Sequence, residues 1–342
     1  MSATITYDRT MRVLVLGGTR FIGRAIVDEL LAAAHQVTIV HRGEHEPPDM
    51  PVVTHLHIPR ADWPAHAAHF AAAQPDAVID CLAMSGDDAR CALAAIPGGA
   101  HMVVLSSQDV YRAFASLNAA RDTDAVPIDE SAPLSEDRYT HRGRGAEYEL
   151  YSKRDVEEEY GGRGAIVLRL PATYGEHDDQ RREEFILRRV RARRRSIPMG
   201  PGGFLWTRGW VRDIARGARL ALEHPECAGE VFNLGEEHTW SVRLWAQRIL
   251  EAAGADTETE LVEVPDDALP QDLSLSAGRI SQHVLVGTAK ARALLGYTDS
   301  DALTALRSSV TWHLNHPPDV ADADFDPDDA ALGCRLPPRE LG

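Results

Sequence analysis

The chain has 342 residues, of which 44% are hydrophobic, and it carries a formal net charge of −16 at pH 7. This length and apolar content are sufficient for one large α/β unit or for two domains with a real core. The negative charge argues against duplex nucleic acid and anionic membrane surfaces as partners, because both repel a polyanion.

The first predicted elements are a strand, a glycine turn and a helix. Arg12–Leu16 is an apolar run of strand length, and Phe21–Leu31 carries apolar residues at helical spacing. The turn between them admits close approach of a ligand, and the free N–H groups at the helix start suit a pyrophosphate. This context predicts a dinucleotide site, although a tight turn in another kind of α/β protein is the alternative. The expected contacts are Gly17, Thr19, Arg20, Phe21, Ile22 and Gly23.

Strand and helix patterns alternate through the first half of the chain, which predicts a doubly wound parallel sheet. The further strands are expected at Gln36–Val40, Val53–Ile58, Ala77–Leu82, His101–Ser106 and Ala165–Leu170. Helices are expected at Ala65–Ala73, Asp87–Ala95 and Glu147–Tyr160. Right-handed crossovers place the carboxyl ends of all these strands on one edge, where ligands bind. Leu82, Ala83 and Ser106 fall on that edge and are further candidate cofactor contacts.

The second half is less regular and is expected to form a smaller α/β lobe over that edge. Helices are predicted at Glu183–Arg195, Val211–His224, Val242–Ala253 and Asp301–His313, and strands at Val231–Leu234, Glu260–Val264 and Val284–Val286. We expect residues 1–175 to be mainly the cofactor domain and 176–316 mainly the substrate lobe, with the chain crossing back around 204–235. Residues 317–342 form an acidic, proline-containing tail.

The residues after the second strand bear on cofactor choice. An NAD site favours Asp or Glu there to hold the ribose 2′-hydroxyl, whereas this chain has His41 and Arg42. Together with Arg20, and with Arg60 after the third strand, they predict a 2′-phosphate and hence NADP, with NAD as the second choice. A solvated basic turn is the alternative explanation.

The end of the fifth strand carries polar groups suited to catalysis. Ser107 is placed to donate a hydrogen bond to a substrate carbonyl or alkoxide, and Asp109 is a second candidate acid or base. A serine that merely caps a turn is the alternative.

These motifs, in this order, resemble those of the extended short-chain dehydrogenase/reductases, the NAD-dependent epimerase/dehydratase family. The segments that carry the resemblance are GGTRFIG, SSQDVY, LRLPATYG, WVRDIA and VFNLG. It implies a Rossmann domain, a C-terminal substrate lobe, nicotinamide chemistry often on nucleotide-linked sugars, and pairing into homodimers near the catalytic helix. Ser107 matches the family's catalytic Ser/Thr, while Pro171 and Thr173 match the segment against the nicotinamide. Gln108 and Asp109 stand where the family's sugar dehydratases have an acidic pair.

The family's catalytic helix carries Tyr-x-x-x-Lys, a spacing that places both side chains on one helical face. Here Lys153 is the candidate lysine, but Glu149 stands four residues before it and Tyr151 only two. Three accounts remain open: the helix starts late or bulges so that a tyrosine reaches the site, Glu149 transfers the proton, or the dyad is lost. A Glu149–Lys153 surface pair is the structural alternative.

Two further features concern partners. The segment 181–195 holds eight arginines, which is typical of a solvated helix face, with an anionic substrate as second interpretation and nucleic acid as third. The 15 histidines show no ligand spacing along the sequence, so no metal site is expected.

The sequence also bears on location. The four cysteines show no CxxC spacing, residues 1–10 lack a signal-peptide core, and no window approaches eighteen consecutive apolar residues. A cytoplasmic protein that contacts no membrane is therefore expected.

The hypothesis with most support is an NADP-dependent epimerase, dehydratase or carbonyl reductase acting on a sugar nucleotide or a similar polar hydroxylated metabolite. The alternatives are a cofactor-binding scaffold or sensor that has lost the dyad, and a non-redox enzyme that keeps the nicotinamide structurally.

Overall fold

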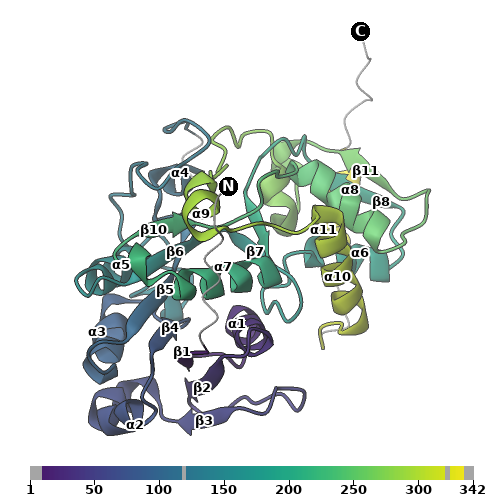
Figure 1. The fold of residues 1–342 in the computed structure, drawn as a ribbon. Helices are drawn as coiled ribbons and strands as arrows, with labels where there is room; N and C mark the ends of the chain where they lie inside the picture. The colour runs from purple at the N-terminus through teal and green to yellow at the C-terminus, as the bar shows by residue number, and fades with distance from the viewer. Residues whose placement is uncertain (1–9, 118–120, 320–323, 335–342) are drawn as a thin grey trace, which may run out of the picture.

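A computed structural model describes residues 10–117, 121–319 and 324–334. Its largest element is a seven-stranded, all-parallel sheet in the order β10-β6-β5-β4-β1-β2-β3 (Figure 1). The strands are β1 (Arg12–Leu16), β2 (Gln36–His41), β3 (Thr54–His57), β4 (Ala77–Asp80), β5 (His101–Ser107), β6 (Ile166–Leu170) and β10 (Val231–Asn233). The central strands are buried on both sides, as their continuous apolar sequences require. The expected Rossmann-type sheet is confirmed.

Helices cover both faces of this sheet. One face is packed by α1 (Phe21–Ala32), α7 (Val211–Glu223) and α9 (Ala289–Leu295), whose apolar residues join a single core with β1 and β2. The other face is packed by α2 (Ala67–Ala72), α3 (Gly86–Ala95) and α5 (Lys153–Gly161). These helices do not cover the carboxyl edge of the sheet, where the second lobe packs.

The second lobe is built on that edge from short elements around a third core. It contains two two-stranded parallel sheets, β8 (Ser196–Met199) with β11 (Glu260–Glu263) and β7 (Ala172–Tyr174) with β9 (Arg208–Trp210). Its helices are α6 (Glu184–Arg191), α8 (Val242–Ala252) and α10 (Ala302–Asn315). The short helix α4 (Arg112–Ser116) opens the long excursion that follows β5.

Two predicted elements differ most from those observed, while the helix predicted at Glu183–Arg195 ends early, at Arg191. The helix expected at Glu147–Tyr160 begins only at Lys153, because the Ser152 hydroxyl caps it by accepting from the amide of Asp155; residues 146–148 form a single 3-10 turn. The strand expected at Val284–Val286 consists only of isolated bridges, to Trp206 and to Ile128.

The arginine-rich helix α6 is partly a buried interface rather than a solvated face. Arg189 is fully buried and forms ion pairs with Asp272 and with Asp328 of α11 (Asp326–Gly333). The described part of the acidic tail is therefore fixed to the second lobe by a buried arginine. Within the described residues, no helix combines the length and apolarity needed to cross a bilayer.

Candidate active site

The glycine turn after β1 is shaped for close approach. Gly17 and Gly18 have φ of +95° and +117°, which side-chain-bearing residues rarely adopt. A Cβ on Gly23 would lie 2.7 Å from the amide nitrogen of Gly18, so α1 starts directly against the turn. Arg20, the residue before α1, makes no side-chain cap. The first-turn amides of a 12-residue helix thus face the carboxyl edge, which fits a pyrophosphate.

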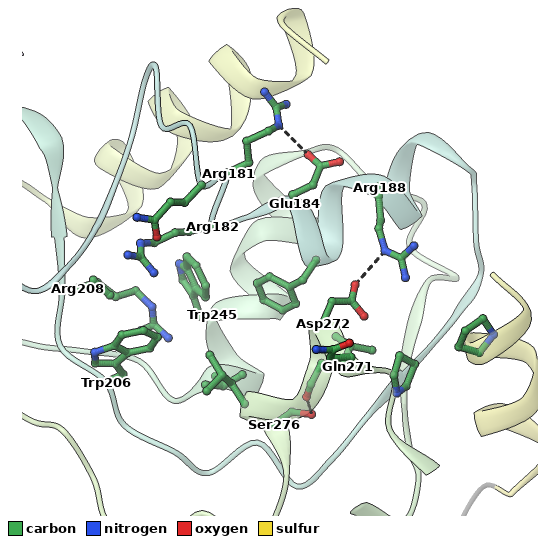
Figure 2. A pocket seen from close by; sticks show the side chains of 18 residues that line it. Arg181, Arg182, Glu184, Arg188, Trp206, Arg208, Trp245, Gln271, Asp272 and Ser276 are labelled. Carbon is green, nitrogen blue, oxygen red and sulfur yellow. Dashed lines mark hydrogen bonds and ion pairs between the residues drawn. The ribbon is translucent and has the colours of Figure 1, made fainter. Parts of the chain in front are cut away.

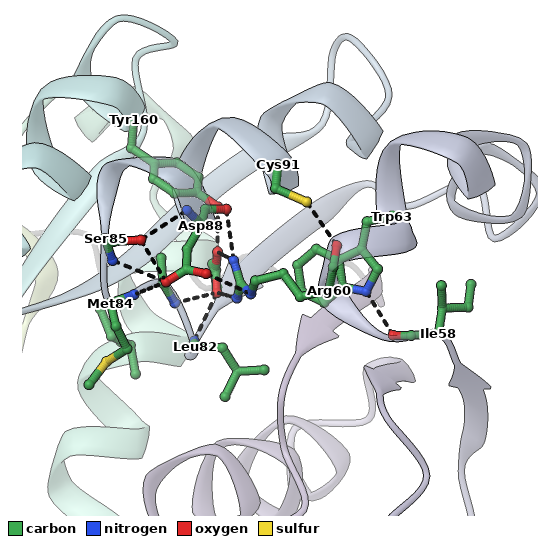
Figure 3. A network of polar contacts seen from close by, with 12 residues as sticks. Ile58, Arg60, Trp63, Leu82, Met84, Ser85, Asp88, Cys91 and Tyr160 are labelled. Atoms are coloured by element: carbon green, nitrogen blue, oxygen red, sulfur yellow. Dashed lines mark hydrogen bonds and ion pairs between the residues drawn. The ribbon is translucent and has the colours of Figure 1, made fainter. Parts of the chain in front are cut away.

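A buried carboxylate fixes the turn after β4. Asp80 accepts hydrogen bonds from the amides of Leu82 (2.8 Å) and Ala83 (3.1 Å), and from the hydroxyl of Tyr160 (2.6 Å). The guanidinium of Arg60 pairs with it at 3.0 Å and also donates to the backbone of Asp88, in the network of Figure 3. The sequence suggested that Arg60 selects a 2′-phosphate, but here it neutralises Asp80.

Lys153 is held at the carboxyl ends of β4 and β5. Its ammonium group donates to the carbonyls of Ala83 (2.7 Å) and Leu105 (3.0 Å), and the side chain is almost completely buried. Burial lowers the pKa of Lys153, and the carboxylates of Asp109 and Asp80 oppose that effect. The amine therefore lies at the carboxyl edge of the sheet, between the ends of β4 and β5.

Tyr151 reaches the same place despite its spacing. Because Ser152 has extended backbone (φ −153°, ψ 97°) and the helix starts after it, Tyr151 and Lys153 are alternate residues of an extended segment. Side chains two apart in extended chain point to the same side. The helix thus starts late, as the first of the three accounts requires.

The Tyr151 hydroxyl enters a polar cluster at the end of β5. It donates to Oδ2 of Asp109 (2.7 Å), interacts with the Ser107 side chain, and shares that carboxylate oxygen with Nε2 of His141 (2.9 Å). Burial and the negative charge of Asp109 raise the pKa of Tyr151 well above its ordinary value. The phenol is consequently a proton donor at neutral pH.

Glu149 does not join this cluster. Its half-exposed carboxylate accepts from the amide of Gly143 (3.0 Å) and lies 3.9 Å from Arg142. Ser106, a predicted cofactor contact, donates to Glu157 (2.5 Å), which is paired with a buried arginine of β6.

The segment after β6 lies under the second lobe. Pro171 precedes β7, and Thr173 is buried, with its carbonyl accepting from Arg182 Nε (2.7 Å). This places both predicted nicotinamide neighbours between the sheet edge and the lobe.

A cavity of about 770 Å³ continues from Ala172 into the lobe. Figure 2 shows its tryptophans, Trp206 and Trp245, beside the guanidinium groups of Arg182 and Arg208. Arg208 packs 4.1 Å from the Trp245 ring, and burial lowers its pKa to about 10. Among the described residues, neither Arg182 nor Arg208 forms a close ion pair with a carboxylate, so the cavity presents one buried cation, one partly buried cation and flat aromatic surface.

The other predicted cofactor contacts lie at the opposite end of the edge. Arg42 and Arg20 are mostly exposed; Arg42 pairs with Glu44 at 3.1 Å and Arg20 lies 3.9 Å from Asp179. His41 is buried, and its ring contacts His55 and Glu46. It is therefore not a free cation that could bind a 2′-phosphate.

Sequence reasoning did not identify His141. The residue lies in the excursion after β5, more than thirty positions from its partner Asp109. The length of that excursion indicated proximity to the site, but no spacing pattern singles out this histidine.

The seven-stranded parallel sheet, the glycine turn at its edge and the lobe above define a Rossmann-type α/β protein. Residues 13–235 match the NAD dependent epimerase/dehydratase family. The chain belongs to that family.

Similar proteins span several activities. The 2′-dehydrokanamycin reductase of Streptomyces kanamyceticus is 28% identical over 261 residues, covering 72% of this chain and 68% of the relative. The chloroplast stem-loop binding protein of 41 kDa b from Arabidopsis thaliana is 24% identical over 340 residues, covering 95% and 85%. The solved structure of UDP-glucose-4-epimerase from Stenotrophomonas maltophila, with bound NAD and formylated UDP-arabinopyranose, has a TM-score of 0.67 at 17% identity, covering 90% and 98%; it shows the shared fold.

Proposed function

We propose that this protein is an NADP-dependent oxidoreductase of its family, acting as epimerase, dehydratase or carbonyl reductase on a sugar nucleotide or a similar polar hydroxylated metabolite. The observation that carries this proposal is the convergence of Ser107, Tyr151 and Lys153 at the carboxyl end of β5. Asp109 joins them through its hydrogen bond to Tyr151.

The residues of the edge fit a dinucleotide. The amides of the turn Gly17–Gly23 would hold the pyrophosphate, and Lys153 would bind the nicotinamide ribose. Pro171 and Thr173 would lie against the nicotinamide ring. A bound nicotinamide would supply or accept hydride. Arg42 and Arg20 are the cations available to a 2′-phosphate, since each is held only by an exposed carboxylate.

Proton transfer falls to the chain's own groups. Ser107 donates a hydrogen bond to the substrate oxygen, and the neutral phenol of Tyr151 delivers its proton there. Asp109 Oδ2 lies within hydrogen-bond distance of both the phenol and His141 Nε2, so a proton carried by the His141 ring would pass through Asp109 to replace the one that Tyr151 gives up. A donor with a raised pKa suits protonation of the oxygen formed when a carbonyl is reduced, which favours the reductase direction.

The cavity supports an anionic substrate with a flat or hydroxylated body. Arg208 is buried and Arg182 is partly buried, and neither forms a close ion pair with a carboxylate within the described ranges, while Trp206 and Trp245 offer stacking surfaces. The relatives named above include a reductase of an aminoglycoside and an epimerase of a sugar nucleotide.

A small molecule, rather than nucleic acid, is the partner we propose. The net charge is −16, and the arginines of the basic segment are largely engaged, as in the pairs Arg188–Asp272 and Arg194–Asp329. We also propose cytoplasmic localisation and, by analogy with the family, a homodimer.

Titration of the purified protein with NADPH and NADH, followed by quenching of tryptophan fluorescence, tests the cofactor assignment. We expect tighter binding of NADPH. Arg42→Ala should lose about 1.4 kcal/mol or more of NADPH binding, tenfold in Kd, while NADH binding is retained. Arg195→Ala, an equally exposed arginine of the lobe, is the control. If neither nucleotide binds the folded wild type, the proposed function is wrong.

Transfer of deuterium from 4-labelled NADPH to keto-sugar substrates tests the chemistry. Label in the alcohol product indicates a reductase, whereas interconversion of sugar epimers without net cofactor turnover indicates an epimerase. Cofactor binding with no turnover of any carbonyl, alcohol or sugar-nucleotide substrate would favour the scaffold hypothesis.

A further inference from the structure

The outer strands of the sheet gather three histidines on one face. In the parallel register of β2 and β3, His41 is opposite His57 and Ile39 is opposite His55. Because alternate residues of a strand share a face, His55 and His57 point to the same side as His41. The rings are splayed, with centroids 4.9 to 5.9 Å apart and the His41 and His57 planes at 90°.

A carboxylate from the loop after β2 completes the group. Oε1 of Glu46 hydrogen-bonds to Nε2 of His57 and lies 3.3 Å from Nε2 of His41 and 3.7 Å from Nδ1 of His55. His41 Nε2 and His55 Nδ1 are 2.8 Å apart. All four ligand atoms lie within 4.8 Å of one another.

These separations are those of a small coordination sphere. Zinc bonds of about 2.0–2.2 Å to imidazole nitrogen and carboxylate oxygen in a tetrahedron place ligand atoms roughly 3.3 Å apart. Small adjustments of the side chains would therefore make the four atoms equidistant from a central ion.

We propose that His41, Glu46, His55 and His57 form a binding site for a divalent transition metal of the zinc class. Three imidazoles with one carboxylate favour Zn²⁺, Co²⁺ or Ni²⁺ over Mg²⁺ and Ca²⁺, which take oxygen ligands. The site is independent of the proposed function and contradicts the expectation from sequence spacing that no metal binds.

Nε2 of His41 faces the other ligand atoms, 2.8 Å from Nδ1 of His55 and 3.3 Å from Oε1 of Glu46. The amide of Gly43 donates to Nδ1 of His41 at 3.2 Å, so the metal-free neutral ring carries its proton on Nε2. Metal binding exchanges this long hydrogen bond for coordination at Nε2 and moves the proton to Nδ1. Gly43, at φ +83°, lies in the loop that adjusts.

The carboxylate of Glu46, which faces all three imidazoles, would supply negative charge to the cation. Coordination would fasten the loop between β2 and β3 to the sheet edge.

The test uses the full-length protein without a polyhistidine tag, stripped with a chelator and titrated with Zn²⁺ against a chromophoric competitor. We expect one equivalent of Zn²⁺ to bind, and Co²⁺ to give the intense visible bands of a tetrahedral site. His55→Ala/His57→Ala should weaken binding by more than ~100-fold, because losing two ligands costs more than losing an outer-shell partner, which costs ~10–100-fold.

Glu46→Gln keeps the side-chain shape in an exposed loop and serves as a second variant that is expected to fold. It should weaken Zn²⁺ binding while its circular dichroism matches wild type. His66→Ala/His69→Ala removes another neighbouring pair, with ring centroids 5.5 Å apart, and should leave binding unchanged. Failure of the wild type to bind Zn²⁺, or equal binding by the His55/His57 and His66/His69 variants, overturns the proposal.

Discussion

The hydroxyl of Tyr151 donates a 2.7 Å hydrogen bond to the carboxylate of Asp109, which also accepts from His141 at 2.9 Å. A lysine close to a catalytic tyrosine lowers the phenol's pKa, whereas this carboxylate raises it. The phenol is therefore kept protonated, and Asp109 and His141 are the acid–base groups beside it. The contact with Asp109 therefore determines the protonation state of Tyr151 more directly than the altered spacing of Tyr151 and Lys153 does.

Asp109→Asn should lower kcat by about 10²- to 10⁴-fold, the usual contribution of a positioned acid–base group. The amide preserves the shape but removes the charge, so the pKa of Tyr151 falls toward the value set by burial alone. Activity that needs the neutral phenol should then decline at lower pH than in the wild type. The measurement is kcat against pH for NADPH-dependent carbonyl reduction.

His141→Gln removes the imidazole that hydrogen-bonds to the carboxylate of Asp109. We expect a smaller fall in kcat than for Asp109→Asn, with Tyr151→Phe at least as severe as either. An Asp109→Asn variant with an unchanged alkaline limit would show that the phenol is not the group titrating.

Lys153→Met should weaken NADPH binding and lower kcat, since the ammonium group is removed from the carboxyl edge. It should also destabilise the protein by about 1–3 kcal/mol, because the buried carbonyls of Ala83 and Leu105 lose their donor. Urea unfolding and NADPH titration measure the two effects separately.

Glu149→Gln is the matched comparison for Lys153→Met. Its carboxylate is half-exposed and lies apart from the Tyr151 cluster, so we expect a stability change within about 0.5 kcal/mol and unchanged activity. Loss of activity in Glu149→Gln with full activity in Lys153→Met would reverse the roles proposed for these residues.

The sheet could be predicted from sequence because its signals are local. Arg12–Leu16 has the bounds expected from its apolar run, and α1 begins at Phe21 as the turn glycines indicated. Each of these elements is specified by residues within it, and alternation with helices then fixes a parallel sheet.

The position of Tyr151 could not be predicted in this way, because a single capping residue, Ser152, decides it. Ser152 ends the extended chain and starts α5 at Lys153, whereas a helical pattern extended back to Glu147 places Tyr151 on the wrong face. The contact of His141 with Asp109 spans 32 positions, and that of His41 with His55 spans 14 and depends on the register of β2 and β3. The alternate spacing of His55 and His57 places these two on one face of a strand, but it does not indicate which residues lie opposite them.

Asp328→Asn should destabilise the protein by about 3–5 kcal/mol, because it leaves the fully buried guanidinium of Arg189 with incomplete compensation. Asp329→Asn, on the next residue and in the exposed pair with Arg194, should cost about 0–1 kcal/mol. Urea unfolding of both variants provides the test, and equal effects would mean that the tail helix α11 contributes nothing through Arg189.

Glu183→Gln should change the pH dependence of stability. Glu183 is fully buried; one carboxylate oxygen accepts from the Ser309 hydroxyl (2.5 Å), and the other has no hydrogen-bond partner among the described residues and lies 3.7 Å from Nε2 of His313. Burial raises its pKa from 4.5 to about 7. Between these values the folded state holds a proton that the unfolded state has released, so the free energy of unfolding falls as pH rises through this window and levels off above it.

The glutamine cannot ionise, so the variant does not show this fall in the free energy of unfolding as pH rises. Relative to wild type, the variant should gain on the order of 3 kcal/mol in free energy of unfolding between pH 4.5 and 8, since each pKa unit corresponds to about 1.4 kcal/mol. His313, 3.7 Å away and with a pKa lowered to about 4 by burial, titrates below the window in the folded state and is present in both proteins. Glu251→Gln, at an exposed site, is the control. Parallel stability curves for Glu183→Gln and wild type across this range would mean that Glu183 ionises in the fold as readily as in the unfolded chain.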